Sequence, residues 1–333
     1  MSQRNIRIDT LRGAACILLV SFHLVGSGPT SGLKLDESDP LILANAVFAY
    51  LRMPLFSFLS GYVYAWHPYR RDAAAFIRGK ARRLLIPMFV VGTLFAILQT
   101  ITPGTNAGAY DWSMLHILPV SHFWFLESLF LIFVVIAALE HFAAMATEHG
   151  FALVFFVAAV VHVAQPLPVH FGLLGATYLF PFVLLGVWCN RFGERRSGST
   201  QLSVGLSLSL LGIAYSAFVA QAMPLRSSAP ALAIGLGTCV ALLRLKRESA
   251  WLAWIGHHSF AIYLFHTVFT GASRILLTSA GVSAIWVLVL VGMLAGTLLP
   301  IATELGLRRV PVLGRWVLGE SKPKPSLRAD ATQ

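Results

Sequence analysis

Long apolar runs separated by short polar segments fill nearly all of this 333-residue chain. We expect each run to be a helix, since in lipid only helices and closed barrels satisfy their own backbone hydrogen bonds. Several runs are short for a hydrocarbon core about 30 Å thick. The runs cover residues 11–28, 47–66, 84–101, 122–141, 150–165, 171–190, 202–222, 229–245, 251–273 and 283–305. The pattern therefore predicts an all-α, polytopic membrane bundle of about ten transmembrane helices.

Composition supports a membrane protein without a separate soluble domain. Hydrophobic residues make up 57% of the chain and charged residues only 12%, about half the charge of an average soluble domain. Residues 1–320 are expected to form one membrane-embedded domain, and the polar residues 321–333 a disordered cytoplasmic tail. A basic start before an apolar run also resembles a signal peptide, with cleavage near Gly26–Ser27, but we expect the first span to stay uncleaved.

Lysine and arginine indicate the orientation of the helices. If the N-terminus is cytoplasmic, all but four of the 25 basic residues lie in cytoplasmic segments. The four exceptions, which face outward, are Lys34, Arg52, Arg226 and Arg274. The positive-inside rule thus places both termini in the cytoplasm. It also ascribes the net charge of +11 to topology rather than to nucleic-acid binding. We expect the protein to lie in the inner (cytoplasmic) membrane.

Cysteine spacing argues against metal and disulfide chemistry. Cys16, Cys189 and Cys239 fall inside or beside apolar runs, with no spacing typical of metal ligands. We therefore expect neither structural disulfides nor a bound metal.

Arg12 and His23 share one face of the first predicted helix. Eleven steps of 100° return to within about 20° of the start, and cover about 16 Å along the axis. With Arg12 at the cytoplasmic surface, His23 would lie near the middle of the bilayer. An imidazole at that depth has three explanations: a hydrogen bond between helices, a proton relay in a transporter, or a general base in a transfer reaction. A cationic entrance leading to a buried imidazole suits an anionic substrate with a long arm, such as a coenzyme A thioester.

Other basic residues offer further contacts for an anionic substrate. Arg78, Arg82 and Arg83 precede the third run, where they either line a phosphate site through bidentate hydrogen bonds or only set topology. Arg52 departs from the positive-inside pattern at the start of the second span. It either snorkels to the outer headgroups or contacts an acyl oxyanion or an acceptor sugar.

Polar residues near the outer ends of later spans are additional candidates. Glu127 lies inside the fourth span, and we expect it to need a partner such as Arg52 or a histidine. His122 and Trp124 are expected at the outer interface, where Trp124 is either an aromatic-belt anchor or a substrate-stacking residue. His266, in the outer half of the ninth span, either binds the acceptor or packs within the bundle.

Five sequence blocks together resemble the acyltransferase-3 family of integral membrane acyltransferases. The opening RIDTLRGAACILLVSFH contains the family's arginine, ten residues and histidine. The blocks RMPLFSFLSGYVYAW, ARRLLIP, SHFWFLESLFLIF and WLAWIGHHSFAIYLFHTVF resemble, in order, its second-span, third-span, fourth-span and late blocks. Many members carry an acidic pair shortly after the fourth-span block, whereas here only Glu127 follows, and closer.

The resemblance implies roles for several residues. It makes His23 the base, and it assigns Arg12 and the Arg82/Arg83 segment to an acyl donor, usually acetyl-CoA from the cytoplasm. It also implies a cell-envelope glycan as the acceptor, and the ending LRRVPVLGRWVLG is similar to the branch that decorates surface polysaccharides.

The sequence as a whole thus predicts a membrane O-acyltransferase that moves an acyl group, expected to be acetyl, from cytoplasmic acyl-CoA to a polysaccharide hydroxyl. The expected catalytic residues are His23, Arg52 and Glu127; Arg12, Arg78, Arg82 and Arg83 bind the donor, and His266 and Trp124 bind the acceptor. The expected partners are acyl-CoA, the glycan acceptor and the lipid bilayer, with no nucleic acid and with the oligomeric state open. Two alternatives are a proton-coupled secondary transporter and an acyltransferase that acts on a lipid or small-molecule hydroxyl.

Overall fold

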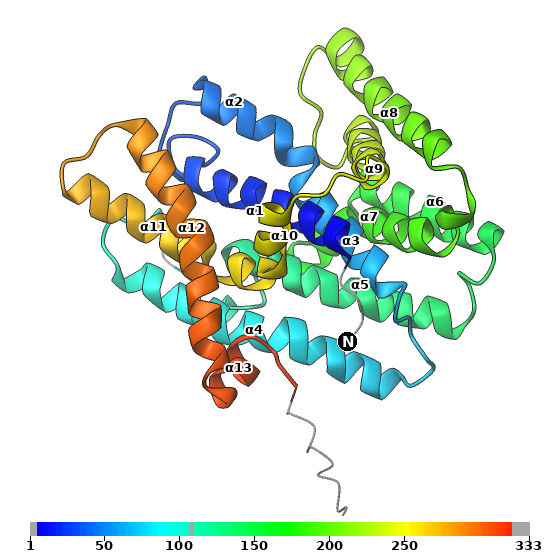
Figure 1. Ribbon diagram of the computed structural model, residues 1–333, viewed down its shortest axis with the longest axis horizontal. Coiled ribbons are helices and arrows are strands. Elements are labelled where there is room, and N and C mark those ends of the chain that lie inside the picture. Colours follow the sequence, from blue (N-terminus) through cyan, green and yellow to red (C-terminus); the bar gives the residue numbers. More distant parts are fainter. Residues whose placement is uncertain (1–4, 107–109, 322–333) are drawn as a thin grey trace, which may run out of the picture.

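The computed structural model describes residues 5–106 and 110–321, and these residues form a helical bundle with no strand (Figure 1). The predicted tail therefore lies, apart from Ser321, outside the described residues. The helices are α1 Ile6–Val25, α2 Pro40–Val47, α3 Arg52–Tyr64, α4 Ala73–Ile101, α5 Trp124–His141, α6 Glu148–Ala164, α7 Leu173–Arg191, α8 Gly198–Ala214, α9 Ala229–Arg244, α10 Ala250–His257, α11 Ser259–Ser279, α12 Ile285–Arg308 and α13 Pro311–Val317.

The predicted helical spans are confirmed as a set. Within the described residues, eight segments are long and apolar enough to cross a membrane, and α6 and α9 are shorter apolar helices. Each of the ten predicted runs overlaps one of these ten segments. The protein is therefore a multi-pass, all-α membrane bundle.

Two of the predicted spans are wrong in their continuity. The second run is not one helix, because α2 ends at Val47 and α3 begins only at Arg52 after a short 3₁₀ turn. The ninth run is interrupted at His258, which has a non-helical ψ of 13° and separates α10 from α11. The His258 ring forms a 2.7 Å hydrogen bond to Glu304 of α12, which holds the chain at this break.

Helix α4 begins eleven residues before the predicted third run. Asp72 caps its first turn by accepting a hydrogen bond of 2.9 Å from the backbone N–H of Ala75. Such a cap satisfies one of the free N–H groups at a helix start. As a result, Arg78, Arg82 and Arg83 lie on the helix itself rather than in a loop before it.

Helix α1 occupies the centre of the bundle, where it packs against α3, α10, α11 and α12. Its contact with α10 depends on two glycines. A Cβ atom on Gly13 would lie 1.9 Å from the Leu252 carbonyl oxygen, and one on Gly256 would lie 1.9 Å from the Asp9 carbonyl oxygen. Small residues of this kind let two helix backbones approach closely in membranes.

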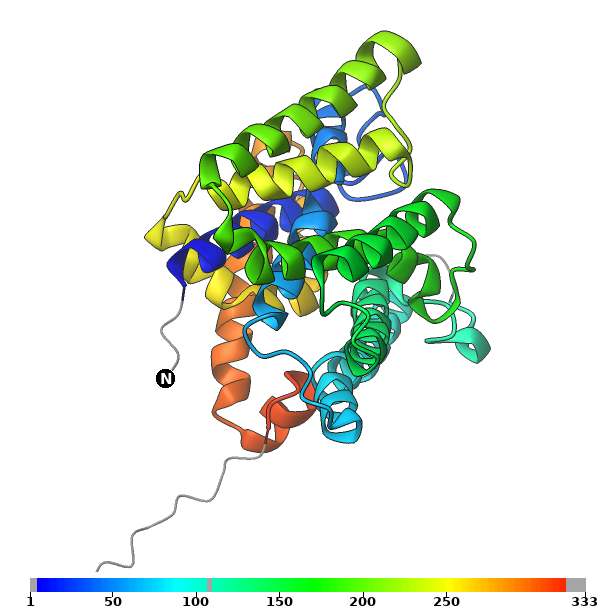
Figure 2. The same ribbon diagram turned by 90° about the vertical axis from the view of Figure 1, so that its right-hand side faces the viewer.

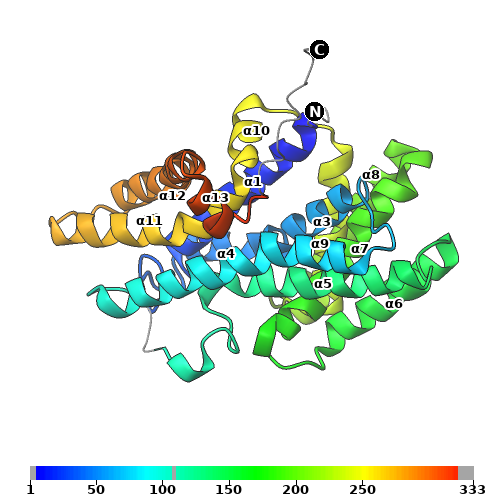
Figure 3. The ribbon, with the colours of Figure 1, turned by 90° about the horizontal axis from the view of Figure 1, so that it is seen from below.

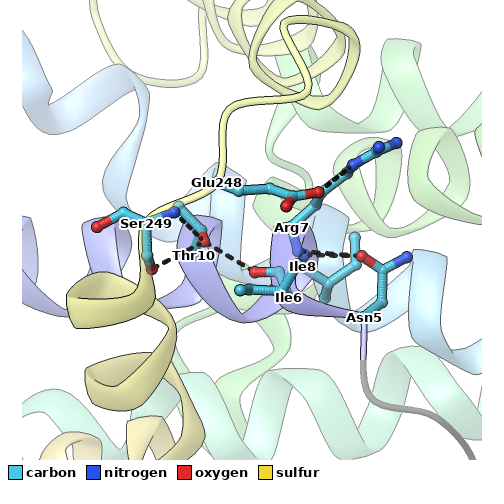
Figure 4. Close-up of polar contacts among 7 residues, drawn as sticks. All are labelled: Asn5, Ile6, Arg7, Ile8, Thr10, Glu248 and Ser249. Carbon is cyan, nitrogen blue, oxygen red and sulfur yellow. Dashed lines mark hydrogen bonds and ion pairs between the residues drawn. The ribbon is translucent and has the colours of Figure 1, made fainter.

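Polar contacts fix the start of α1 beside the segment that leads into α10 (Figure 4). Asn5 caps α1, and the Nε atom of Arg7 lies 2.7 Å from a carboxylate oxygen of Glu248. The Thr10 hydroxyl accepts a hydrogen bond from the backbone N–H of Ser249, at 3.1 Å. These contacts fix the N-terminal half of α1 against the segment before α10.

The remaining helices pack around this centre in pairs. Helices α8 and α9 form a hairpin along one side (Figure 2), and α4 and α5 run side by side (Figure 3). Only 17% of the span that contains α8 is buried in the protein, so most of its apolar surface is left to face lipid.

The ion pairs lie at the end of the bundle where α1 begins. Arginine–carboxylate pairs within 4.0 Å are Arg7–Glu248, Arg12–Asp9, Arg191–Glu140, Arg196–Glu148, Arg244–Glu194, Arg308–Glu304 and Arg308–Glu320. These residues belong to the segments that the sequence places in the cytoplasm. The opposite end carries the loops that follow α1, α4 and α11.

Candidate functional site

Three histidine rings from three distant parts of the sequence meet at the C-terminal end of α1. The ring centroid of His23 lies 4.9 Å from that of His266 in α11 and 5.6 Å from that of His122, just before α5. His122 and His266 are 5.0 Å apart. His122 was expected at the outer interface; it is only 4% exposed and belongs to this histidine cluster.

The hydrogen bonds of His266 fix the position of its proton. Its Nδ1 atom donates to the carbonyl oxygens of Ile262 and Tyr263, at 2.8 and 3.0 Å. A carbonyl only accepts, so Nδ1 carries the hydrogen and Nε2 carries the lone pair. That Nε2 atom is buried and has no hydrogen-bond partner among the described residues. The same is true of both ring nitrogens of His122. The cluster therefore holds polar atoms that are free to take part in proton transfer.

A large vestibule of about 620 Å³ reaches His23 from the end of the bundle opposite the start of α1. Polar side chains from the α1–α2 loop, the α4–α5 loop and helices α4 and α11 line it: Ser27, Ser31, Gln99, Thr102, Thr105, Asn106, Tyr110, Ser121, Thr267, Thr270 and Arg274. Burial raises the pKa of Tyr110, so its hydroxyl keeps its proton. The vestibule is rich in hydroxyl and amide groups, which suits a polar, hydroxylated ligand.

A second, smaller pocket of about 90 Å³ also borders His23. Its lining is Leu19, Phe22, His23, Ala49, Arg52, Met53, His122, Trp124, Tyr178, Arg226 and Tyr263. Phe22 and His23 line both the vestibule and this small pocket. His23 therefore lies at the junction of the two spaces.

Arg52 is buried in the wall of the small pocket, with a relative exposure of 3%. Its Nη1 atom donates to the carbonyl oxygen and to the side-chain Oδ1 of Asn45, at 2.8 and 2.9 Å. Its Cζ atom lies 4.0 Å from the ring centroid of Phe22. The guanidinium is thus held inside the protein beside His23, and it does not extend outward as snorkelling would require.

Glu127 does not pair with Arg52 as the sequence led us to expect. It is 4% exposed in the first turn of α5, and neither carboxylate oxygen accepts a hydrogen bond from the part of the chain that the structure describes. The close approach of Gly172, where an added Cβ would lie 2.7 Å from Glu127 Cβ, explains why α5 is tightly covered at this point. Arg52 instead donates a hydrogen bond to Asn45 of α2. The side chain of Asn45 in turn donates to the carbonyl oxygen of Gly26, in the loop after α1.

His23 lies two residues before the C-terminal end of the 20-residue helix α1. Because α1 covers Ile6–Val25 rather than residues 11–28, His23 is closer to the end of its helix than the predicted span implied. Between Arg12 and His23 the shared face is closed by packing, since Cys16 is 0% and Leu19 2% exposed.

The expected donor-binding residues lie apart from the histidine cluster. Arg12 is 3.3 Å from Asp9 near the start of α1, and Arg78, Arg82 and Arg83 occupy the first three turns of α4. None of the four lines either pocket. The expected acceptor residues do lie at the site: Trp124 lines the small pocket, and His266 lies in the cluster.

Sequence reasoning missed some of the site. Asn45 and Arg226 were not proposed, although Asn45 is a single amide in an otherwise apolar stretch, a signal that was available. Within the described ranges, no group of three or more histidine, cysteine or acidic side chains is arranged to hold a metal ion.

Comparison with known proteins identifies the family. A model of the acyltransferase-3 family, described as an acyltransferase domain, matches residues 5–304 and so covers nearly the whole chain. No curated protein and no solved structure gives a significant match. The match includes every helix of the site, and it supports an acyltransferase over the transporter considered from the sequence. This chain, with His23 between two pockets of a multi-pass helical bundle, therefore belongs to the acyltransferase-3 family of membrane acyltransferases.

Proposed function

We propose that the protein transfers an acetyl group from cytoplasmic acetyl-CoA to a hydroxyl of an envelope or exported polysaccharide at the inner (cytoplasmic) membrane. The observation that carries the proposal is the position of His23, which lines the vestibule and belongs to the cluster of three histidine rings. A transferase must bring two reactants together at one general base, and His23 is a suitable side chain for that role.

The vestibule is the proposed site for the acceptor. Its volume of about 620 Å³ lies within the range of ligand pockets, which is roughly 300–1,000 Å³. Its hydroxyl and amide side chains are able to exchange hydrogen bonds with sugar hydroxyls, and Phe95 and Tyr110 add aromatic surface. It lies at the end of the bundle that the charge pattern places outside the cytoplasm, where a polysaccharide is exported.

The donor approaches from the opposite end in this proposal. The phosphates of coenzyme A bind Arg12 and the α4 arginines Arg78, Arg82 and Arg83, since arginine forks match phosphate geometry. The pantetheine arm then extends along α1 for the roughly 16 Å from Arg12 to His23. Because Cys16 and Leu19 are packed in the structure, entry of the arm requires these side chains and their neighbours to move apart.

The proposed reaction is a direct transfer. His23 takes the proton from the acceptor hydroxyl, whose oxygen attacks the thioester carbon. The tetrahedral oxyanion is stabilised by the positive charge of Arg52. Glu127 lies one turn along α5 from Trp124 and lines neither pocket, so no step of the reaction is assigned to it. The C–S bond then breaks, and the thiolate of coenzyme A takes the proton from the His23 imidazolium.

The test is acetyl transfer by purified protein in proteoliposomes, with acetyl-CoA on one side and glycan on the other. We expect His23→Ala to lower the rate by at least about a hundredfold, the usual contribution of a general base. His149→Ala is the matched control, because His149 is exposed on α6 and lines neither pocket. Full activity of His23→Ala would contradict the proposal, and product found only in lipid or in a small molecule would change the acceptor.

A further inference from the structure

Two arginines face the small pocket without a carboxylate partner. Arg52 and Arg226 both line it, and their Cζ atoms lie 4.0 and 6.0 Å from the ring centroid of Phe22. Neither arginine has a carboxylate within 4.0 Å among residues 5–106 and 110–321. No aspartate or glutamate lines the pocket. Of these two positive charges, that of Arg52 is buried and that of Arg226 is exposed, and neither has a carboxylate beside it among the described residues.

At the opposite end of the bundle, the arginines of α1, α7, α9 and α12 lie within 4.0 Å of aspartate or glutamate, whereas those of α4, which are partly or fully exposed, have no such partner among the described residues. Burial of an unpaired charge is costly, and a protein tolerates it where the charge has a ligand or a partner to meet. Arg52 is only 3% exposed and has no acidic partner among the described residues, so its buried charge favours an anion from outside the protein.

The orientation of Arg52 leaves hydrogen-bond donors for that anion. Both of its hydrogen bonds to the protein come from Nη1, and both go to Asn45. Asn45 is held in turn by its own Nδ2 bond to the carbonyl oxygen of Gly26, at 3.2 Å. The Nε and Nη2 atoms of Arg52 remain for a carboxylate or phosphate, which such forks bind in a bidentate manner.

Distance and size relate this anion to the acceptor. The Phe22 and His23 ring centroids are 5.0 Å apart, so the Arg52 Cζ atom is at most 9.0 Å from the His23 ring. One hydrogen bond of about 2.8 Å to Arg52 and another to His23 take up most of this distance. The remainder matches the few covalent bonds that separate a hydroxyl from an acidic group on one sugar. The pocket, at about 90 Å³, holds roughly three water molecules, which suits a carboxylate or phosphate but not a whole sugar ring.

We propose that Arg52 and Arg226 bind an anionic group, a carboxylate or a phosphate, carried by the acceptor, so that the protein selects acidic glycans. This inference rests on the proposed function, because it assigns the vestibule to the same acceptor. The sugar ring occupies the vestibule, its acidic group enters the small pocket, and a neighbouring hydroxyl faces His23. Arg226, on the loop before α9, supplies a second positive charge. The acidic group of the acceptor and the tetrahedral oxyanion of the reaction therefore do not depend on one arginine alone.

The experiment measures equilibrium binding to the purified protein in detergent, without any acyl donor. The probes are methyl glucuronoside, which carries a carboxylate, methyl glucoside, which is neutral, and inorganic phosphate as a competitor. We expect the glucuronoside to bind at least tenfold more tightly than the glucoside, and to be displaced by phosphate or by salt. Equal affinity for the two glycosides, with no effect of phosphate, would overturn the proposal.

Variants identify the residue that reads the charge. Arg226→Gln should lower glucuronoside affinity about tenfold or more, the effect of losing one charged hydrogen bond. Arg226→Lys should restore part of it, since the charge remains while the fork is lost. The control is Lys34→Asn, which removes an exposed cation near the same end at a left-handed position that asparagine accepts. Equal losses in Arg226→Gln and Lys34→Asn would show only a general field effect and contradict a built site.

The outcomes separate this inference from the proposed function. Binding that depends on Arg226 in a protein that transfers no acetyl group supports the anion site and contradicts the transfer reaction. Acetyl transfer at equal rates to acidic and neutral glycans contradicts the anion site and supports the transfer. Binding of phosphate but not of the glucuronoside assigns the site to a phosphorylated acceptor.

Discussion

The imidazole rings of His23 and His266 lie 4.9 Å apart, although 243 positions separate them in the chain. One ring comes from the end of α1 and the other from the second turn of α11. His266 is completely buried, with its Nδ1–H bonded to the backbone of its own helix. Its free Nε2 lone pair is therefore presented to the histidine cluster in a fixed tautomer.

This arrangement predicts that His266→Ala weakens catalysis through His23. We expect kcat to fall by about 10- to 100-fold and KM to change little, because the lost group supports the base rather than holding the acceptor. The measurement is the pH profile of kcat in His266→Ala and in wild type, with His149→Ala as control. A large rise in KM with unchanged kcat would instead return His266 to the acceptor site predicted from the sequence.

The contact between α1 and α10 predicts strong sensitivity to a single methyl group. In Gly13→Ala the new Cβ would lie 1.9 Å from the Leu252 carbonyl oxygen, so the two helices must separate. We expect destabilisation of about 1–3 kcal/mol or more, as for overpacked cores. The measurement is thermal unfolding in detergent.

Gly79→Ala is the matched control for this substitution. Gly79 lies in α4 with open space around the position of a Cβ. There, alanine should be neutral or stabilising by up to about 1 kcal/mol, because it has the higher helix propensity. Similar melting temperatures for Gly13→Ala and wild type would show that the helices separate easily.

The helices were predictable from the sequence because lipid leaves a long apolar run few other structures. The breaks were not, since they depend on contacts between distant segments. The break at His258 follows from its bond to Glu304, 46 positions away, and hydropathy carries no trace of that bond. The interruption of the second span has a related cause, because α2 ends before a short 3₁₀ turn and its Asn45 bonds to Gly26 in the loop after α1.

The site was predictable only as separate residues. His23, Arg52, Trp124 and His266 were chosen from the sequence, and the structure brings all four to one region. Their mutual geometry was not predictable, because a single helix face relates Arg12 to His23 but says nothing of α11. The pairing of Arg52 with Asn45 rather than Glu127 likewise depends on how α2 folds back, which has no local pattern.

His116 gives the fold a pH dependence outside the membrane-spanning segments. Its Nε2 atom lies 2.8 Å from the Thr93 hydroxyl, and partial burial lowers the pKa of its ring below the ordinary 6.5. The unfolded chain then binds more protons than the folded one between the two pKa values. Stability should therefore rise with pH through that window, and fall as the pH drops below about 6.5.

The measurement is the melting temperature of wild type and of His116→Gln between pH 5 and pH 7.5. The glutamine keeps a polar contact to Thr93 but does not titrate, so the difference between the two proteins isolates His116. We expect the wild type to lose more stability on acidification than the variant. An equal or smaller loss in wild type would show that His116 does not contribute to acid sensitivity.

Asn45 is expected to hold the Arg52 guanidinium in position, and two substitutions of Asn45 should have different effects. Asn45→Ala removes the 2.9 Å acceptor of Arg52 Nη1 and the tie to Gly26, so Arg52 becomes mobile. We expect about a tenfold loss in kcat/KM for acetyl transfer and a destabilisation of about 1–3 kcal/mol. Asn45→Asp keeps an oxygen at that place but adds a negative charge beside the guanidinium.

The aspartate should hold Arg52 in position while neutralising it. Asn45→Asp is therefore expected to melt closer to wild type than Asn45→Ala does, yet to bind an anionic ligand more weakly than either protein. The measurements are thermal unfolding and glucuronoside binding on the same samples. If Asn45→Asp binds the glucuronoside as tightly as wild type, the positive charge of Arg52 is not what draws an anion into the small pocket.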